Sequence, residues 1–370
     1  MLPKILQNYI YLDNAATVKC FEEVNKVSLQ VEQDYWYNSS ALYQPSLVVS
    51  DCIERAREQV AKSLDVAAQD IYFVGSATEA NNWAINKGIK DKNGKVLYSI
   101  IEHASVSTTV QNLSTTSQQV LIDSQGRVDL LDLQSKLTTD TTLVSIAHVC
   151  GNSGVVNNIS DISKLVRKLA PKAILHSDGV QAWCKWDYSL VDLDVDMYTV
   201  SAHKIGGKKG LGILYIRKGL NISSLINGGG HERGKRAGTV NNSSIISLPC
   251  AIDAYRSQPM SHYQVMHDYI KSSLKNIDIL MLPTDLPHIF VVCFGGLRAE
   301  ILQRQLCDQG VIVGVGSACS AKDKVNKILS IRNIDRYYLN GAIRISLGPH
   351  NTMQEIQQAC DTILRIVNNV

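Results

Sequence analysis

The sequence has no pair of cysteines in a C-x-x-C arrangement, although it contains nine cysteines in 370 residues. An odd number of scattered thiols is not typical of a disulfide framework. The missing pairs also argue against a zinc site built on such motifs. We therefore expect free thiols in a reducing cytoplasm, and no metal site.

Long apolar runs and blocks of like charge are also missing. A membrane span needs about 18 apolar residues in a row, and the sequence has no such stretch. Residues 1–10 lack the apolar core of a signal peptide. The formal net charge is only +3, and basic runs are as short as Lys208-Lys209. This pattern argues against direct contact with nucleic acid. Apolar residues make up 45% and charged residues 19% of the chain, a balance that is typical of globular proteins.

Strand-like and helix-like segments alternate along the first two thirds of the chain. A helix is expected over residues 50–64, which have apolar residues at helical spacing and Ser50 as a possible N-cap. The alternation predicts an α/β fold with a mostly parallel sheet covered by helices. After residues 249–259 the pattern changes to that of a smaller α+β domain. The strands expected in the first part are 70–74, 96–101, 143–148, 173–176 and 197–200.

Two charged residues lie at the ends of expected strands, where open α/β sheets bind ligands. Lys204 follows strand 197–200 and could form a Schiff base with an aldehyde cofactor. Asp178 follows strand 173–176 and could keep a pyridine nitrogen protonated, as pyridoxal phosphate (PLP) requires. A solvated lysine and an aspartate that caps the next helix are the structural alternatives.

Three further segments are weaker indications of a site. Ala77-Thr78 lies at a strand-to-helix turn, which could bind an anion or simply begin a helix. His103 follows strand 96–101 and could stack on a planar ring or serve a structural role. Arg344 lies in an apolar strand and needs a partner, which could be a substrate carboxylate or an internal acidic residue.

One thiol stands apart from the others. Cys319 lies among small residues at 314–320, and lysines in the following polar segment would favour its thiolate form. Cys52, Cys293 and Cys360 fall in or beside apolar stripes and are expected to be buried and inert. Cys150, at the end of the central strand, is the alternative nucleophile.

Taken together, the order of these motifs resembles the class V (fold type I) PLP enzymes, and within them the cysteine desulfurases of the NifS/IscS group. The resemblance extends over nearly the whole chain. Its motifs are Tyr11-Leu12-Asp13-Asn14-Ala15-Ala16-Thr17, Ser76-Ala77-Thr78-Glu79-Ala80-Asn81-Asn82, Glu102-His103-Ala104, Ser201-Ala202-His203-Lys204, Gly228-Gly229-Gly230-His231-Glu232-Arg233-Gly234, Gly316-Ser317-Ala318-Cys319-Ser320 and Arg344-Ile345-Ser346-Leu347-Gly348.

The resemblance implies a large PLP-binding domain, with a mostly parallel seven-stranded sheet between helices, and a smaller α+β C-terminal domain. We assign residues 15–252 to the large domain, and residues 1–14 with 253–370 to the small domain that carries Cys319. The implied reaction removes sulfur from L-cysteine, leaving L-alanine and a persulfide on Cys319. A homodimer would then pass the sulfur to an acceptor protein of iron–sulfur cluster assembly or tRNA thiolation.

The resemblance also implies roles for individual residues. Lys204 would hold the cofactor and move protons, Asp178 would pair with the pyridine nitrogen, and Gln181 would bond the ring oxygen O3′. His103 would stack on the ring and assist proton transfer, while Arg344 would hold the substrate carboxylate. Asn38 would assist in substrate binding. The residues implied at the phosphate are Ala77, Thr78, Ser201, His203 and, from the partner subunit, Thr239.

Three positions depart from the family pattern. Gly151 replaces an asparagine that contacts the cofactor ring, Tyr37 replaces one near the substrate carboxylate, and Tyr43 replaces a histidine. These departures leave alternatives open: a selenocysteine lyase or cysteine sulfinate desulfinase, or a PLP-binding partner protein with weak turnover.

Overall fold

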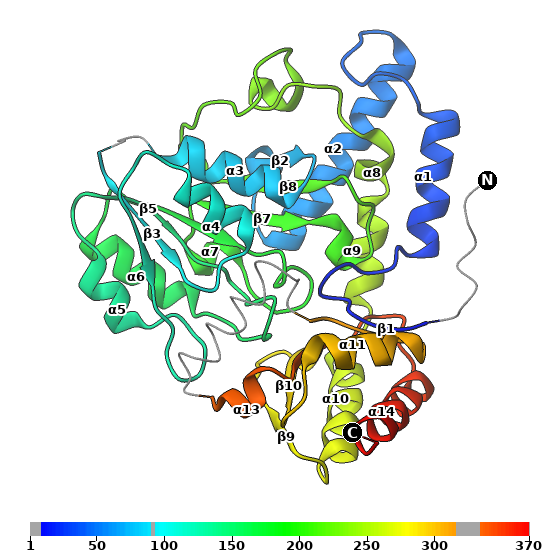
Figure 1. Cartoon of the computed structure of the whole chain (residues 1–370). Coiled ribbons are helices and arrows are strands. Elements are labelled where there is room, and N and C mark those ends of the chain that lie inside the picture. The colour runs from blue at the N-terminus through cyan, green and yellow to red at the C-terminus, as the bar shows by residue number, and fades with distance from the viewer. Residues whose placement is uncertain (1–8, 90–92, 316–333, 370) are drawn as a thin grey trace.

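A seven-stranded sheet forms the centre of the computed structural model, which describes residues 9–89, 93–315 and 334–369 (Figure 1). Its strands are β2 (Ile71–Val74), β3 (Lys95–Ser99), β4 (Ser117–Val120), β5 (Thr141–Ser145), β6 (Ile174–Asp178), β7 (Met197–Ser201) and β8 (Gly212–Ile216). They lie in the order β2-β8-β7-β6-β5-β3-β4. Strand β8 runs antiparallel to both of its neighbours, β2 and β7, and the other pairs of adjacent strands are parallel. The expected mostly parallel sheet is confirmed.

Helices cover both faces of this sheet. Val144 and Leu175 contribute to a core shared with α1, α2, α6 and α9, whereas the preceding residues Leu143 and Ile174 contribute to a core shared with α3 and α4. Successive side chains of a strand point to opposite faces, so a sheet covered on both sides needs continuous apolar strands. The helices are α1 (Glu22–Asp34), α2 (Gln44–Leu64), α3 (Ala77–Gly88), α4 (Ala104–Gln111), α5 (Leu130–Lys136), α6 (Ile159–Leu169), α7 (Leu190–Leu193), α8 (Asn242–Ile246) and α9 (Leu248–Arg256).

The C-terminal part of the chain builds two smaller sheets around a separate core. One sheet is antiparallel, with β10 between β12 and β9; in the other, β1 pairs in parallel with β11. Leu12 of β1 belongs to this second core, so the start of the chain packs with its end (Figure 1). The elements are β1 (Ile10–Leu12), α10 (Met260–Leu274), β9 (Ile279–Met281), β10 (Ile289–Phe294), α11 (Ala299–Asp308), β11 (Val311–Val313), α13 (Arg336–Leu339), β12 (Ala342–Ser346) and α14 (Met353–Val367).

The start of α2 differs from the sequence expectation. The helix begins at Gln44, with Tyr43 as N-cap and Pro45 in its first turn, so Ser50 lies inside the helix and does not cap it. Proline is well suited to the first helical turn because its fixed φ is helical and its missing N–H would have no partner there. The proline was therefore the better signal of where the helix begins.

Among residues 9–89, 93–315 and 334–369, no helix is both long and apolar enough to cross a bilayer. The same residues contain no cluster of three or more His, Cys, Asp or Glu side chains arranged to hold a metal ion.

Candidate active site

Lys204 and Asp178 meet at the carboxyl ends of two adjacent strands. Asp178 ends β6 and pairs in register with Thr199 of β7, and Lys204 follows the end of β7. The loop after β1 covers this edge of the sheet, because the Lys204 Nζ donates to the carbonyl oxygens of Ala15 (2.7 Å) and Ala16 (2.8 Å). The parallel strands thus place both side chains where the sequence predicted a site.

The ammonium group of Lys204 is in an environment that favours its neutral form. Its pKa is lowered to about 8, mainly by burial and next by the positive charge of Arg344, while Asp178 and Asp13 act in the opposite direction. A lysine of lowered pKa is a better nucleophile near neutral pH, because more of it is present as the free amine. Lys204 is therefore suited to attack an aldehyde.

The carboxylate of Asp178 is held by two donors. Its Oδ2 accepts from Asn81 Nδ2 (2.8 Å), and its Oδ1 accepts from the Val180 N–H (3.0 Å). Asn81 Nδ2 also lies 2.8 Å from Ser105 Oγ. Asp178 therefore stabilises the turn that follows it, although it does not cap a helix as the structural alternative expected, because the next helix begins only at Leu190. Its carboxyl group remains buried and oriented beside Lys204. The role of Asn81 was not predicted.

His103 extends this network to the surface. It is the N-cap of α4: its Nδ1 accepts from the Ser105 N–H (3.1 Å) and lies 2.8 Å from Ser105 Oγ. Because Nδ1 accepts, the proton of a neutral ring is on Nε2. The ring is exposed. His103 thus has the structural role considered above, and hydrogen bonds through Ser105 and Asn81 join it to Asp178.

The N-terminus of α3 forms a potential anion site beside β7 and β8. Ser76 caps the helix by accepting from the Glu79 N–H (3.1 Å), which leaves Ala77 and Thr78 in the first turn. Gly212 pairs with Ser201 of β7. A Cβ on Gly212 would lie only 2.3 Å from the Ser76 carbonyl carbon. The first turn of α3, whose N–H groups can bind phosphate, therefore packs directly against the Ser201–Gly212 pair.

His203 lies next to this region and contacts the same loop as Lys204. Its Nδ1 is 3.1 Å from Thr17 Oγ1. Burial lowers its pKa to about 4, with smaller contributions from the charges of Lys204, Lys185 and Lys209. The ring is therefore neutral at pH 7 and can act as a hydrogen-bond donor or acceptor without adding charge.

Gln181 connects Lys204 to a second buried lysine. Gln181 Nε2 donates to the Ala15 carbonyl (2.9 Å), which Lys204 also contacts, and its Oε1 accepts from Lys185 Nζ (2.8 Å). Lys185 was not among the predicted site residues. Its position in the apolar segment Ala182-Trp183-Cys184-Lys185 was the available signal, since lysine is rarely buried fully.

Arg344 has an internal partner. Its Nη2 donates to Asp13 Oδ1 (2.7 Å) and its Nη1 to the Gly151 carbonyl (2.9 Å). Its buried Nε has no hydrogen-bond partner in the described structure. The guanidinium group thus lies at the edge of the Lys204 region. Of the two partners considered for Arg344, an internal acidic residue and a substrate carboxylate, Asp13 is the internal one.

Asn38 and Thr239 are not brought to Lys204 within one chain. The Phe21 N–H donates to the Gly206 carbonyl (3.1 Å), which places the start of α1 beside the Lys204 loop. The 13 residues of α1 then rise by about 20 Å before the exposed Asn38. Thr239 is also exposed, and its segment is joined to the Asn38 loop because Asn242 Nδ2 donates to the Tyr37 carbonyl (2.9 Å).

The cysteines differ in exposure. Cys150, Cys293 and Cys360 are buried, and Cys150 packs with Ile101 and Ile122. The expectation for Cys52 was wrong in part, since it is half-buried at the edge of the packed face of α2. Eight cysteines, those that the structure describes, are free thiols. Cys319 lies outside the described residues.

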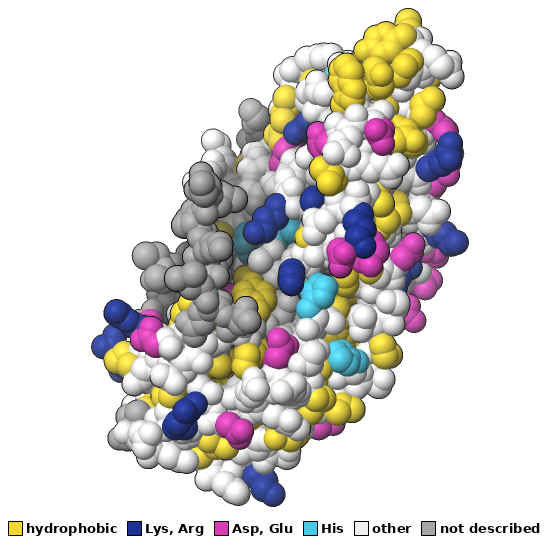
Figure 2. Space-filling model, turned by 90° about the vertical axis from the view of Figure 1, so that its right-hand side faces the viewer, with side chains coloured by type: hydrophobic (Ala, Val, Ile, Leu, Met, Phe, Trp, Pro, Cys, Tyr) yellow, Lys and Arg dark blue, Asp and Glu magenta, His cyan; other side chains and the backbone are white. Residues whose placement is uncertain are grey.

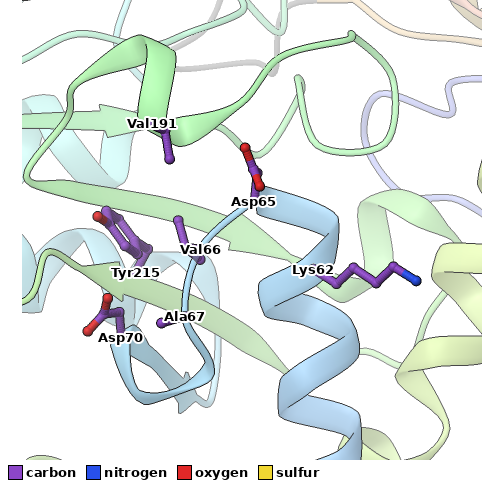
Figure 3. A pocket seen from close by; sticks show the side chains of 7 residues that line it. All are labelled: Lys62, Asp65, Val66, Ala67, Asp70, Val191 and Tyr215. Carbon is purple, nitrogen blue, oxygen red and sulfur yellow. The ribbon is translucent and has the colours of Figure 1, made fainter.

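Figure 3 shows a pocket of about 400 Å³ that is separate from this site. Asp70, which lines it, precedes β2, and β2 runs parallel to β7 because both are antiparallel to β8. The pocket therefore opens at the amino end of these strands, opposite the end that carries Lys204. Its lining residues are Lys62, Asp65, Val66, Ala67, Asp70, Val191 and Tyr215.

The chain belongs to the class-V aminotransferase family, whose model matches residues 10–359. A Clostridium botulinum protein named cysteine desulfurase IscS is 31% identical over 98% of this chain and 95% of its own length. A NifS/IcsS protein homolog from Lactobacillus delbrueckii subsp. bulgaricus is 34% identical over 94% of both chains.

Solved structures show the same relationship. A NifS-like protein superposes with a TM-score of 0.92 and 31% identity over 98% of this chain and all (100%) of the other. A protein described as SspA in complex with cysteine has a TM-score of 0.81 and 25% identity, covering 92% of this chain and 99% of its own. The expected fold type I architecture is confirmed, and the family depends on PLP.

The residues of this chain fit that cofactor at three points. Lys204, with its lowered pKa, matches an aldehyde, and the buried Asp178 matches a pyridine nitrogen that must stay protonated. The first turn of α3 matches a phosphate group. These three groups converge on one edge of the sheet, as a single elongated ligand with these functions requires.

Proposed function

We propose that the chain is a PLP-dependent cysteine desulfurase, which transfers sulfur from L-cysteine to its own Cys319 and releases L-alanine. The observation that carries the proposal is the placement of a lysine of lowered pKa, Lys204, beside the fixed carboxylate of Asp178. The names of several relatives at about 31% identity over nearly the full chain support the choice of reaction.

When bound, PLP withdraws electrons from the substrate carbon atoms through its protonated pyridine ring. The residues of the chain prepare this chemistry. Asn81 and the Val180 N–H hold the Asp178 carboxylate in one orientation, so that its charge stabilises the proton on the ring nitrogen. Lys204, once its amine is free, accepts a proton from the substrate carbon and returns it.

Arg344 is the proposed partner of the substrate carboxylate. Its planar group can hold a carboxylate with two parallel hydrogen bonds, and its Nε has no partner in the described structure. The Asp13 carboxylate holds Nη2 when substrate is absent. Substrate would then replace one carboxylate by another, so that no guanidinium charge is left buried without a partner.

The sulfur step is assigned to Cys319. Its thiolate attacks the sulfur atom of cysteine, forming an S–S bond while the carbon–sulfur bond breaks. The electron pair left on carbon takes a proton to give L-alanine, and the added sulfur remains on Cys319 as a persulfide. The setting of this cysteine in Gly316-Ser317-Ala318-Cys319-Ser320 supports the assignment, and the buried surroundings of Cys150 argue against the alternative.

We also propose that the enzyme is a cytoplasmic homodimer, in which Thr239 and Asn38 serve the site of the partner subunit. Both lie on adjoining surface segments, away from the Lys204 of their own chain. Exposed hydrophobic side chains lie beside them, including Trp36 (66% exposed) and Leu42 (90% exposed). Figure 2 shows hydrophobic side chains gathered at this end of the molecule. The persulfide would pass to an acceptor protein of iron–sulfur cluster assembly or tRNA thiolation.

The proposal is tested by loading purified protein with PLP and adding cysteine with a reductant. Wild-type protein should show a visible absorption band and release sulfide and alanine in equal amounts. Lys204→Ala should lose the band, and Cys319→Ser should keep the band but lose sulfide release, whereas the control Cys52→Ser should behave as wild type. Mass spectrometry should place the added sulfur on the Cys319 peptide.

Sulfide release by Cys319→Ser at the wild-type rate, or added sulfur on Cys150, would contradict the mechanism. Turnover of selenocysteine or cysteine sulfinate by Cys319→Ser, without turnover of cysteine by the wild type, would instead indicate the lyase or desulfinase alternative. A loaded protein that turns over none of these substrates would indicate a binding partner.

A further inference from the structure

A buried lysine, Lys185, is joined to the candidate site by a hydrogen bond to Gln181. Lys185 is only 4% exposed, and its Nζ donates to Gln181 Oε1 (2.8 Å). Gln181 Nε2 in turn donates to the Ala15 carbonyl, which also accepts from Lys204 Nζ. Two ammonium groups are therefore connected by one glutamine side chain and one backbone carbonyl.

The position of Lys185 is unfavourable in itself. A buried ammonium group is costly unless it is paired, and within the described structure Lys185 has no ion pair with a carboxylate. Its other contact is distant, with the Tyr255 ring centroid 5.9 Å away. The preceding residue, Cys184, has a left-handed backbone at φ 60°, which is strained for a residue with a side chain. Strain and burial together indicate that the position serves the site.

The hydrogen bond from Lys185 decides which way the Gln181 amide faces. An amide can turn by 180° and exchange its donor and acceptor ends. The ammonium form of lysine only donates, so it can bond only the amide oxygen, and this leaves the Nε2 donor to face Ala15 and the site. Residue 151 lies next to Gln181, because a Cβ at this position would be 3.2 Å from Gln181 Cγ. Gly151 has no side chain, however, and so cannot help to orient the amide.

We propose that Lys185 is a positioning residue that acts through Gln181: it keeps the N–H of Gln181, and not its carbonyl, directed at the ring oxygen of the bound cofactor. The inference rests on the cofactor use in the proposed function. In this proposal Lys185 restrains the Gln181 side chain near the cofactor ring. Gly151 has no side chain that could do so.

The surrounding charges agree with this role. The pKa of Lys185 is lowered to about 7, mainly by burial and also by the charges of Lys204 and Arg344, while Cys184 acts in the opposite direction. The two lysines therefore disfavour each other's protonation. Removing Lys185 should make it easier to keep a proton on the lysine-linked cofactor.

The test compares Lys185→Met with Lys185→Arg in the wild-type and Gln181→Ala backgrounds. Methionine has a similar shape and no donor, so the protein without cofactor should have a stability near that of wild type, because removal of a buried charge offsets the lost hydrogen bond to Gln181 Oε1. Two quantities are then measured for each variant: the dissociation constant for PLP, and the pH midpoint at which the visible band of the loaded protein changes.

We expect Lys185→Met to weaken PLP binding about tenfold, as for the loss of one charge-assisted hydrogen bond, and to move the band midpoint to higher pH. Lys185→Arg should restore values near wild type. In the Gln181→Ala background, Lys185→Met should have little further effect on PLP affinity, because residues that act together are not additive.

A wild-type midpoint and PLP affinity in Lys185→Met would overturn the inference, and so would an undiminished effect of that change on PLP affinity in the Gln181→Ala background. Loss of thermal stability without a spectral shift would likewise show a merely structural lysine. None of these measurements uses cysteine. A protein that binds PLP but releases no sulfide would therefore contradict the proposed function and leave this test valid.

Discussion

At the scale of single residues, the charged side chains of Lys204, Lys185 and Asp178 form hydrogen bonds with neutral groups. Lys204 and Lys185 both donate to amide or peptide oxygens, and Asp178 accepts from an amide and a backbone N–H. Such partners fix the direction of a side chain without neutralising its charge. The site therefore keeps these charges available for a ligand that carries an aldehyde and a pyridine nitrogen.

The lowered pKa of Lys204 predicts how cofactor loading depends on pH. Its pKa is about 8 in the folded protein, below the usual value of about 10.4, so the free amine increases with pH up to about 8. The rate at which cofactor-free protein gains the visible band should therefore rise about tenfold per pH unit below 8 and level off above it. Stopped-flow absorbance would measure this, and a midpoint near 10 would contradict the assigned environment.

The same group predicts a change in stability. Between pH 8 and 10.4 the unfolded chain keeps a proton on Lys204 that the folded chain has lost, so the contribution of this group to the free energy of unfolding rises with pH in that range. In Lys204→Met, which has no titrating group, the rise should be smaller. Denaturant unfolding of cofactor-free protein at several pH values provides the comparison.

The sequence predicted those site residues whose signal is local. Lys204 and Asp178 follow apolar strands, and strand ends are recognisable from the pattern alone. Asn81 and Asp13 could not be found in that way, since their partners lie 97 and 331 residues distant in the chain. The internal partner of Arg344 was foreseen as a type of residue, but only the packed structure identifies it as Asp13.

At the scale of elements, the contact between β8 and the start of α3 shapes the proposed phosphate site. Gly212→Ala would place a methyl group 2.3 Å from the Ser76 carbonyl carbon and 2.6 Å from the Ala77 nitrogen. The backbone cannot move aside cheaply, so we expect a loss of about 1–3 kcal/mol in the free energy of unfolding. Compared with wild type, the variant should lose more affinity for PLP than for pyridoxal, which has no phosphate group.

Gly230→Ala is the matched control. A Cβ at Gly230 meets nothing within 4 Å, and its φ of −78° suits any residue. This variant should bind both ligands as wild type does. If Gly212→Ala weakens PLP and pyridoxal equally, the first turn of α3 does not hold the phosphate.

The positions of helices and strands could be predicted where the sequence has a clear pattern of apolar residues. Strands β2, β6 and β7 lie where they were expected, because continuous apolar residues leave few alternatives. The start of α2 was misplaced because its first turn, Gln44 to Leu47, is partly exposed and carries little hydrophobic signal. Its start depends on Pro45 and Tyr43 instead.

At the scale of the whole molecule, the proposed sharing of sites predicts that cofactor retention depends on protein concentration. If Thr239 of one subunit completes the phosphate site of the other, dilution that separates the subunits should release PLP. Sedimentation velocity with detection in the visible range would follow both events in one experiment. A monomer that keeps its full visible absorbance would contradict the shared site.

The pairing of β1 with β11 also has a consequence for the order in which the protein is made. Ile10 pairs with Val311, so roughly 300 residues of synthesis separate the two strands, or about 15–60 s at ordinary ribosomal rates. All strands of the large sheet, from Ile71 to Ile216, leave the ribosome within that interval. Leu12 reaches its native core only after β11 has emerged, so the first strand to be translated is among the last to find its place.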